Sequence, residues 1–487
     1  MMEWSVPFDQ FIGGRWSRGR AGTVLVDRDP YTGETVAEIP QASLDDLDDA
    51  YASAERAQGT WARSLPSERH RLFTSFLDVL ERRRDEIVDW LVREAGSTRL
   101  KAEMEWRAVR AQAIEASSLA YRMTGKILPG DVPGKENRVY REPLGVIGVI
   151  SPWNWPLSLS NRSVAAAVAL GNTVVLKPAD DTPITGGLLL ARLYEEAGLP
   201  AGVLNVVVGA VEVIGDAFTL HDVPRFVSFT GSTAVGRRIA RLAAESRRLK
   251  GVALELGGNA PLVVLDDADL DRAVDAAVYG RFLHAGQICM STNRIIVDRT
   301  LHADFAAAFR TRVAALRVGD PSDPATVIGP LINRRQLDRL VRGIEVAHEA
   351  GYECLLAGRP EGLVLPPHVF AEVPADAELA RAEQFGPVVG LIRAENEEHA
   401  LRLAEDTEYG LSSAVFTRDL ERGVAFARRL RVGLTHVNDA TVHSAPNCPF
   451  GGEKNSGLGR FGGEWILEEF TTDHLVTVQS TPRTYPF

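Results

Sequence analysis

Short apolar runs alternate with helical patterns from Gly145 onward, and this alternation constrains the fold more than any other feature of the chain. Residues 146–150 form a continuous apolar run, as expected of a strand that is buried on both faces. Further strand-like runs follow at 173–176, 203–208 and 226–229, with helical patterns between them. Strands that alternate with helices in this way predict a parallel sheet with crossover helices, the arrangement of a nucleotide-binding domain.

The same alternation resumes after Glu255 and continues to about Val437, which predicts a second α/β domain. With 487 residues the chain is too long for one hydrophobic core, so two or three domains are expected. The segment 125–143 is rich in glycine, proline and charge and indicates an extended arm, and 470–487 contains a candidate edge strand. The predicted fold class is therefore α/β.

Composition argues against several classes of partner and site. The formal net charge of −11 disfavours nucleic acid or an anionic membrane surface as the main partner. No run of about 18 apolar residues occurs, so we expect no membrane-spanning helix. Cys289, Cys354 and Cys448 are odd in number and irregularly spaced, which fits free thiols in a reducing compartment and gives no metal site. Because the N-terminus lacks a signal-peptide pattern, a cytoplasmic location is expected.

Cys289 and the upstream Glu255 are the strongest candidates for chemistry. The thiolate form of cysteine is a nucleophile, and a carboxylate can act as the base that a later step needs to activate water. A cysteine is more often a buried apolar residue. Gly286 and Ser291, which flank Cys289, weaken that alternative because they indicate an open loop.

Two motifs at the carboxyl ends of predicted strands fit a nucleotide ligand. Gly231 permits a tight turn, and Ser232 can cap the helix that follows, whose N–H groups would face a phosphate. A capped helix without a ligand is the alternative. Lys177 and Asp180 lie where ligands bind in open α/β sheets, and both could hydrogen-bond ribose hydroxyls. The alternative for this pair is a solvated ion pair of the loop.

Three further segments carry candidate residues. Asn154 follows the first buried strand in a loop with two tryptophans and two prolines, and it could donate an N–H to an oxyanion or only satisfy the turn backbone. Glu383 and Phe385 lie next to a glycine turn, where they could hold a ribose and pack on a flat heterocycle. The glycine-rich segment 449–460 permits close backbone approach beneath a pocket.

Together, the order and spacing of these motifs are specific. The chain resembles the NAD(P)-dependent aldehyde dehydrogenase superfamily over nearly its whole length. The segments 286–297 and 437–449 are most similar to the branch that oxidises aromatic aldehydes, which includes benzaldehyde, vanillin and salicylaldehyde dehydrogenases. The motifs that carry the resemblance are Asn154, Lys177, Gly231-Ser232-Thr233, Glu255-Leu256-Gly257-Gly258, Cys289, Glu383 with Phe385-Gly386-Pro387, and Pro449-Phe450-Gly451-Gly452.

The resemblance implies an architecture of three parts. Residues 1–122 and 144–254 would form a Rossmann-like NAD-binding domain, and 255–455 a catalytic domain. Residues 123–143 and 470–487 would form a small β oligomerisation arm that pairs with a second copy of the chain, giving a homodimer or homotetramer.

The resemblance also implies the oxidation of an aldehyde to a carboxylic acid. Cys289 would add to the aldehyde carbon as a thiohemiacetal, Asn154 and the Cys289 N–H would stabilise the oxyanion, and Glu255 would activate water to hydrolyse the thioester. The residues implied to contact the cofactor are Trp153, Lys177, Asp180, Gly231, Ser232, Gly257, Glu383 and Phe385.

The substrate pocket is expected to be apolar and flat-walled, which suits a benzene ring. Its predicted residues are Trp155, Leu159, Arg162, Ile288, Met290 and Phe450. Arg162 could meet an anionic group of the substrate or form a salt bridge away from the tunnel, and we expect the latter. Cys448 is either a small apolar residue of the tunnel or an oxidation-sensitive partner of Cys289.

NAD is the expected cofactor, with NADP as the second option. In relatives that prefer NAD the position of Asp180 is commonly glutamate, and a carboxylate there repels a 2′-phosphate. The alternatives are an aliphatic or semialdehyde dehydrogenase that could use CoA, a non-catalytic binding protein on the same scaffold, and a thiol esterase. Glu255 disfavours transfer to CoA, and the intact set of Cys289, Glu255 and Asn154 disfavours a silent scaffold.

Overall fold

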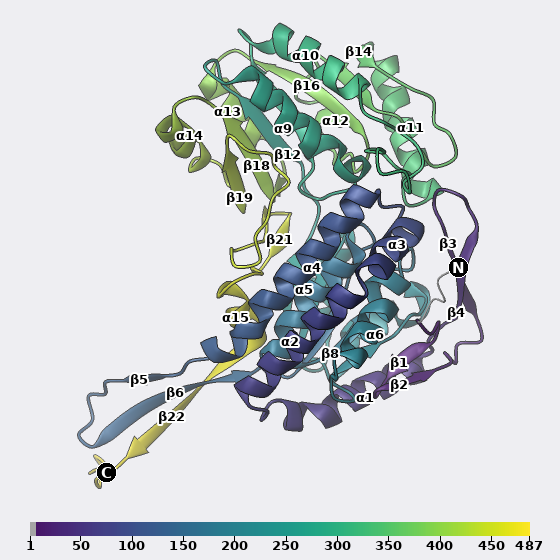
Figure 1. The fold of residues 1–487 in the computed structure, drawn as a ribbon. Coiled ribbons are helices and arrows are strands. Elements are labelled where there is room, and N and C mark those ends of the chain that lie inside the picture. Colours follow the sequence, from purple (N-terminus) through teal and green to yellow (C-terminus); the bar gives the residue numbers. More distant parts are fainter. Residues whose placement is uncertain (1–5) are drawn as a thin grey trace.

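The computed structural model describes residues 6–487. Two units, each built on a sheet with helices around it, lie one above the other, and an arm projects from the lower unit (Figure 1). Within the described residues, no helix is long and apolar enough to cross a membrane. The expectation about a signal peptide concerns the N-terminus, of which residues 1–5 lie outside the described part.

The lower unit contains an eight-stranded sheet in the order β2-β1-β9-β8-β7-β10-β11-β21. Its strands from β9 to β11 are parallel, as predicted, and the strands at the two edges are antiparallel. The strand bounds are β1 (Gln10–Ile12), β2 (Arg15–Ser17), β7 (Val146–Ile150), β8 (Thr173–Lys177), β9 (Leu204–Val206), β10 (Phe226–Thr230), β11 (Gly251–Glu255) and β21 (Gly457–Leu458).

Helices cover both faces of this sheet because its strands are apolar on both sides. Val174 and Leu176 pack into one hydrophobic cluster, and Val175 between them packs into another with Tyr51 and Phe218. The helices of this unit are α1 (Leu44–Trp61), α2 (Pro66–Arg82), α3 (Arg84–Ala95), α4 (Arg99–Leu119), α5 (Pro156–Ala169), α6 (Leu189–Glu196), α7 (Asp216–Leu220) and α8 (Thr233–Glu245). Short 3-10 or π-helical turns lie at Ala120–Arg122, Ile184–Leu188 and Val211–Gly215.

The strand order of the lower sheet reverses next to β7. From β7 the chain proceeds to β8 and β9 on one side and then to β10 and β11 on the other. Ligands of open α/β sheets bind at such a reversal, outside the carboxyl ends of the strands. The predicted residues Asn154, Lys177, Gly231 and Glu255 lie at or just beyond the carboxyl ends of β7, β8, β10 and β11.

The upper unit contains a seven-stranded sheet in the order β14-β15-β16-β13-β12-β18-β19, parallel except for β14. Its strands are β12 (Ala260–Val264), β13 (Thr292–Asp298), β14 (Glu353–Leu356), β15 (His368–Ala371), β16 (Val388–Ala394), β18 (Ser412–Phe416) and β19 (Leu434–Val437). Its helices are α9 (Leu270–Phe282), α10 (His302–Ala314), α11 (Arg334–Glu349), α12 (Glu378–Arg381), α13 (Glu397–Glu405) and α14 (Leu420–Ala427), with a 3-10 turn at Leu283–Gly286.

The two sheets present opposite edges to each other. The chain leaves the lower sheet at the carboxyl end of β11 and enters the upper sheet at the amino end of β12, through residues 256–259. Cys289 precedes β13 and Glu383 precedes β16, so both lie at the amino edge of the upper sheet. Each sheet has its own hydrophobic core. Residues from two cores therefore meet at the junction between the units.

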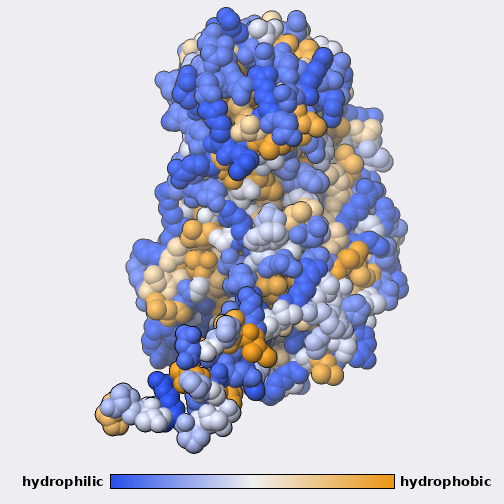
Figure 2. All heavy atoms as spheres, turned by 90° about the vertical axis from the view of Figure 1, so that its left-hand side faces the viewer, coloured by the Kyte–Doolittle hydropathy of each residue, from blue (hydrophilic) through white to orange (hydrophobic). Residues whose placement is uncertain are grey.

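The arm is a three-stranded antiparallel sheet, which agrees with the predicted extended segment and edge strand. It consists of β5 (Lys126–Leu128), β6 (Lys135–Pro143) and β22 (Thr471–Gln479), and α15 (Trp465–Phe470) leads into it. Figure 2 views the molecule from the side of the arm and shows hydrophobic residues along it. Ile127 and Leu475 are 73% and 55% exposed. Two small antiparallel pairs complete the strands, β3 (Val24–Arg28) with β4 (Thr35–Pro40) and β17 (Tyr409–Gly410) with β20 (Glu453–Lys454).

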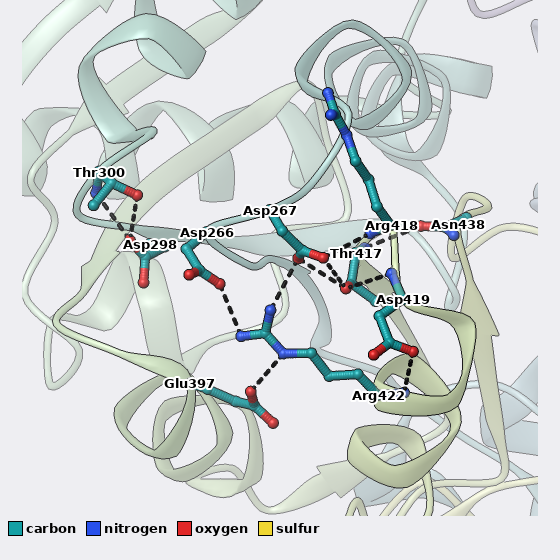
Figure 3. Close-up of polar contacts among 10 residues, drawn as sticks. All are labelled: Asp266, Asp267, Asp298, Thr300, Glu397, Thr417, Arg418, Asp419, Arg422 and Asn438. Atoms are coloured by element: carbon teal, nitrogen blue, oxygen red, sulfur yellow. Dashed lines mark hydrogen bonds and ion pairs between the residues drawn. The ribbon is translucent and has the colours of Figure 1, made fainter.

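A polar network fastens the helices of the upper unit to its sheet. Arg422 of α14 forms ion pairs with Asp266 and Asp267 after β12, at 2.8 and 3.0 Å, and with Glu397 of α13 at 2.8 Å (Figure 3). Asp267 also accepts hydrogen bonds from the Thr417 hydroxyl after β18. The network links four elements far from the junction between the sheets. Its hydrogen bonds are strong because Arg422 is mostly shielded from solvent and its side-chain partners are charged.

Candidate active site

A cavity of about 370 Å³ lies at the junction, a volume within the usual range of small-molecule sites. Its walls come from α4, α5, the loop before β13 and the segment 442–450. The predicted catalytic or substrate residues that line it are Asn154, Trp155, Leu159, Arg162, Ile288, Cys289, Met290 and Phe450. The tertiary structure therefore brings together residues from both units that are widely separated in the sequence.

Cys289 opens into this cavity, and its thiol is held in the neutral form. Burial raises its pKa to about 12, and the carboxyl groups of Glu255 and Glu383 act in the same direction. Arg162 and a hydrogen bond from the backbone of Met290 oppose this rise. A thiol with such a pKa is a weak nucleophile near neutral pH, so nucleophilic attack requires a nearby base or a change in local charge.

Glu255 is buried at the end of β11 with both carboxyl oxygens lacking a hydrogen-bond partner among the described residues. Glu255 is 2% exposed, and burial raises the pKa of its carboxyl group to about 8. The positive charges of Arg162 and Arg460 oppose part of this rise. Buried oxygens without partners are costly and are typical of functional sites. A carboxyl group with this pKa can both accept and release a proton near neutral pH.

Asn154 is oriented by its contact with the Cys289 loop. Its Nδ2 donates to the backbone oxygen of Gln287 at 2.9 Å, and its own loop ends where Pro156 begins α5. A side-chain amide nitrogen carries two hydrogens. One fixes the side chain, and the other is available to a ligand in the cavity that Asn154 lines.

The structure corrects the expectation for Arg162. Its guanidinium lines the cavity and forms no salt bridge with any carboxylate in the described part of the chain. It lies over the rings of Phe450 and Phe461, at 4.7 and 4.4 Å from their centroids, and donates to the Thr230 hydroxyl at 3.3 Å. Cation–π interactions with these two rings hold the guanidinium in place of the expected salt bridge to a carboxylate. The positive charge therefore stays beside the cavity, where burial lowers the pKa of Arg162.

Lys177 and Asp180 form the ion pair that was the alternative to ribose binding, at the end of β8, with 2.9 Å between Nζ and the carboxylate. Lys177 is buried whereas Asp180 is partly exposed, so the pair is not simply a solvated contact of the loop. At the end of β10, Ser232 caps α8 by accepting a hydrogen bond from the Val235 N–H at 3.4 Å. The capped helix is thus present as predicted. Its N-terminus lies at the carboxyl edge of the sheet, where a phosphate could bind.

Glu383 is held on the upper sheet's edge by the segment that links the sheets. Its carboxylate accepts a hydrogen bond from the Gly258 N–H at 2.8 Å, and a Cβ on Gly257 would lie 3.0 Å from the other oxygen. Burial raises the pKa of Glu383 to about 7. The rings of Trp153 and Phe385 meet edge to face, 5.4 Å between centroids. The glycine backbone thus holds the Glu383 carboxylate, and the ring of Phe385, two residues further on, packs against the loop that carries Asn154.

Comparison with known proteins agrees with this geometry. The model of the aldehyde dehydrogenase family matches residues 16–476. The chain belongs to the aldehyde dehydrogenase family. The NAD-dependent benzaldehyde dehydrogenase of Corynebacterium glutamicum is similar in structure, with a TM-score of 0.92 and 45% identity, covering 99% of each chain. A salicylaldehyde dehydrogenase from Pseudomonas putida, solved with salicylaldehyde, has a TM-score of 0.95 and 37% identity, covering 98% of this chain and 99% of the other.

Curated relatives of this aldehyde dehydrogenase are equally similar in length. A vanillin dehydrogenase of Corynebacterium glutamicum is 49% identical over 468 residues, which cover 96% of this chain and 97% of the relative. A benzaldehyde dehydrogenase of Bacillus subtilis is 47% identical over 478 residues, 98% of each protein. The enzyme is thus an aldehyde dehydrogenase of mixed α/β fold, as predicted.

Gln287, which no sequence pattern singled out, positions the candidate catalytic residues of this dehydrogenase. Gln287 donates from its amide to the backbone oxygens of His284 and Pro330, each at 3.3 Å, and accepts from the Ile332 N–H at 3.0 Å. It thereby anchors the loop whose carbonyl orients Asn154. Its place next to Ile288 and Cys289 was the signal that could have identified it.

A buried ion pair on α4 was also missed. Lys101 and Glu105 pair at 2.5 Å with both side chains fully buried. Glu105 accepts a hydrogen bond from the Ser158 N–H at 3.0 Å near the start of α5, and the Lys101 ammonium lies 4.9 Å from the ring centre of Trp155. The i, i+4 spacing of opposite charges is visible in the sequence, but it normally marks an exposed helix face.

Cys448 lines the same cavity as Cys289 and is exposed. All three cysteines are free, and the Cys448 sulfur lies 3.8 Å from the side-chain oxygen of Asn447. A redox role for Cys448 stays a prediction. In the described part of the chain, no group of three or more potential ligands forms a metal site.

Proposed function

We propose that this aldehyde dehydrogenase oxidises aromatic aldehydes to carboxylic acids with NAD as the oxidant. The observation that carries the proposal is the cavity, in which Cys289 and Asn154 share one space with a mainly apolar wall. Trp155, Ile288 and Met290 belong to one apolar cluster beside the nucleophile. Flat aromatic rings gain most from such walls. Relatives named for vanillin, benzaldehyde and salicylaldehyde support this substrate class.

The residues of the chain can carry out the reaction in two stages. In the first, the Cys289 thiol gives its proton to solvent and its sulfur bonds to the aldehyde carbon, while Asn154 and the Cys289 N–H hydrogen-bond the developing oxyanion. One such donor typically contributes about 3–4 kcal/mol to the transition state. After oxidation to the thioester, Glu255 takes a proton from water, and the resulting attack releases the acid and restores the thiol.

The residues at the two sheet edges fit NAD. The buried Lys177 ammonium and the Glu383 carboxylate suit ribose hydroxyls, and the N-terminus of α8 at Ser232 suits a pyrophosphate. Phe385, in contact with Trp153, would support the nicotinamide end, and Gly231 and Gly257 would let the cofactor approach the backbone closely. When bound, NAD supplies the oxidant of the first stage. We propose that residues 1–122 and 144–254 form the NAD-binding domain and 255–455 the catalytic domain.

A panel of aldehydes tests the proposed substrate class. We expect kcat/KM for benzaldehyde or vanillin to exceed that for acetaldehyde by about 100-fold, because an aromatic ring buries far more apolar area than a methyl group. NADH formation with each aldehyde, without and with CoA, is the measurement. Equal or higher efficiency with acetaldehyde would refute the aromatic assignment, and a strict requirement for CoA would refute hydrolysis by water.

Preference for NAD over NADP is expected from Asp180. Its carboxylate beside Lys177 would repel a 2′-phosphate, so kcat/KM should be about tenfold higher with NAD, or about 1.4 kcal/mol in the transition state. The substitution Asp180→Ser should narrow the ratio by raising kcat/KM for NADP. Steady-state kinetics with both cofactors measures this. Wild-type efficiency with NADP equal to that with NAD would contradict the role given to Asp180.

Association through the arm is proposed from its exposed apolar residues. Ile127 and Leu475 lie on a narrow sheet that projects from the lower unit, a surface that a second copy could cover (Figure 2). We expect a homodimer or homotetramer by light scattering, and a monomeric species after Ile127→Glu with Leu475→Glu. A wild-type monomer at micromolar concentration would contradict this. A cytoplasmic location is also proposed, since the three cysteines are free.

A further inference from the structure

Arg281 is a buried arginine that the proposed reaction does not use. It lies near the end of α9, is 0% exposed, and forms no ion pair with any carboxylate of the described residues. Its guanidinium instead donates to oxygens of the chain. Nη1 donates to the backbone oxygen of Thr292 at 3.1 Å and to the side-chain oxygen of Asn293. Glu383 is the main opposite charge that acts on Arg281, but it forms no direct ion pair with it. A buried charge without a direct ion pair is costly, so such a residue needs a reason to be retained.

The second nitrogen of Arg281 joins two loops that carry opposite halves of the site. Nη2 donates to the backbone oxygen of Gly286 at 3.2 Å, in the loop that leads to Cys289. It also donates to the backbone oxygen of Gly386, in the loop that carries Glu383. A Cβ on Gly286 would lie 2.3 Å from Nη2 and 2.5 Å from the Gly386 oxygen. The two loops therefore pack so closely around the guanidinium that a side chain at position 286 would clash with Arg281 and with the Gly386 oxygen.

Both loops contain backbone that is strained without outside support. His284 and Ala285 have φ of 51° and 52°, and Phe385, next to Gly386, has φ of 40°. Residues other than glycine rarely adopt this region, at a cost of about 1–3 kcal/mol each, and persist there only where surrounding contacts hold them. Arg281 is bonded to the residue that follows each strained segment. A planar group with five donors suits this better than lysine or an amide.

We propose that Arg281 is a positioning residue that holds the Cys289 loop and the Glu383 loop in one fixed relation. Thiolate stabilisation by the Met290 N–H depends on the turn that Arg281 supports, and cofactor binding depends on Glu383 in the other loop. Loss of the guanidinium should therefore weaken both properties together. The proposal rests on the proposed function only in that Glu383 contacts NAD.

The test compares Arg281→Met with a matched control, Arg69→Met. Arg69 is also buried and also donates to backbone oxygens, those of Ala62, Ser64 and Ala169, but at the carboxyl end of α5 and outside the cavity. Both variants should unfold at lower temperature than the wild type. Only Arg281→Met should alter the two site-specific readouts, which do not require an aldehyde.

The first readout is the rate of Cys289 alkylation by iodoacetamide across a pH series, localised by mass spectrometry in protein without cofactor. We expect Arg281→Met to move the profile to higher pH and to slow alkylation at pH 8 about tenfold, the effect of one pKa unit. The second readout is the Kd of NAD by titration calorimetry, which we expect to rise about tenfold in the same variant.

Arg281→Lys keeps the charge in a less disruptive form and serves if Arg281→Met does not fold. A single ammonium cannot reproduce the forked geometry, so both readouts should shift in the same direction by about threefold. Wild-type values of either readout in both Arg281 variants, or equal shifts in Arg69→Met, would overturn the proposal. A wild-type protein that binds NAD and alkylates normally but oxidises no aromatic aldehyde would instead refute the proposed function.

Discussion

Replacing Cys289 by serine is expected to lower kcat for aromatic aldehyde oxidation by about 10⁴- to 10⁶-fold, because the covalent step loses its thiol nucleophile. A serine hydroxyl has a far higher pKa than a thiol, and burial at this position disfavours charge further. NADH formation with benzaldehyde measures the loss. Intact-protein mass measured during turnover should show an acyl adduct on the wild type and none on Cys289→Ser.

The chain offers a matched control for this substitution. Cys354 lies on β14, half-buried, with its sulfur 3.3 Å from the backbone oxygen of Leu356. Cys354→Ser should keep kcat within about twofold, since the residue is outside the cavity. Oxidation by Cys289→Ser within tenfold of the wild type would contradict covalent catalysis at this residue.

Replacing Glu255 by glutamine is expected to block release of the acid. Loss of the general base should lower kcat by about 10²- to 10⁴-fold, while thioester formation continues. Rapid-mixing kinetics should then show a burst of about one NADH per subunit followed by a slow phase, with the acylated Cys289 accumulating. In the wild type, turnover should fall as the pH drops below about 8, because the pKa of Glu255 is about 8 and the base must be ionised. Absence of the burst in Glu255→Gln would contradict this role.

The same substitution should change stability with a defined sign. The pKa of Glu255 is raised from 4.5 to about 8 in the folded protein, so between these pH values the unfolded chain loses a proton that the folded protein keeps. Folding is therefore opposed increasingly as the pH rises through this window. Glutamine removes that cost, and Glu255→Gln should unfold at a higher temperature than the wild type at pH 9. At pH 4 the two proteins should differ little, and a lower unfolding temperature of the variant at pH 9 would contradict the raised pKa.

Local patterns predicted the elements that carry the site. The apolar run at 146–150 became β7, and the glycine and serine at 231–232 became the turn and cap before α8, because burial on both faces and helix capping depend on neighbours in the chain. Cys289 and Glu255 could be proposed from the sequence because few residue types can act as nucleophile or base. The extended arm was visible as a segment rich in glycine, proline and charge.

Contacts between distant segments could not be read in this way. Arg162 was expected to leave the tunnel, yet two phenylalanines from the C-terminal part of the chain hold it there. In the sequence, Arg281 cannot be distinguished from other charged residues of a helix. Its hydrogen bonds to Gly286 and Gly386 are formed only because the fold brings these two loops together. The pairing of Lys101 with Glu105 was visible, but its full burial was not.

The amino-acid sequence by itself determined the family, the order of strands and helices, and the residues proposed as nucleophile and base, since these depend on residue type and on spacing along the chain. Tertiary structure decided which charges are buried and which loops touch. The carboxyl edge of one sheet faces the amino edge of another, and this juxtaposition removes water from Cys289, Glu255 and Glu383 and so sets their pKa values.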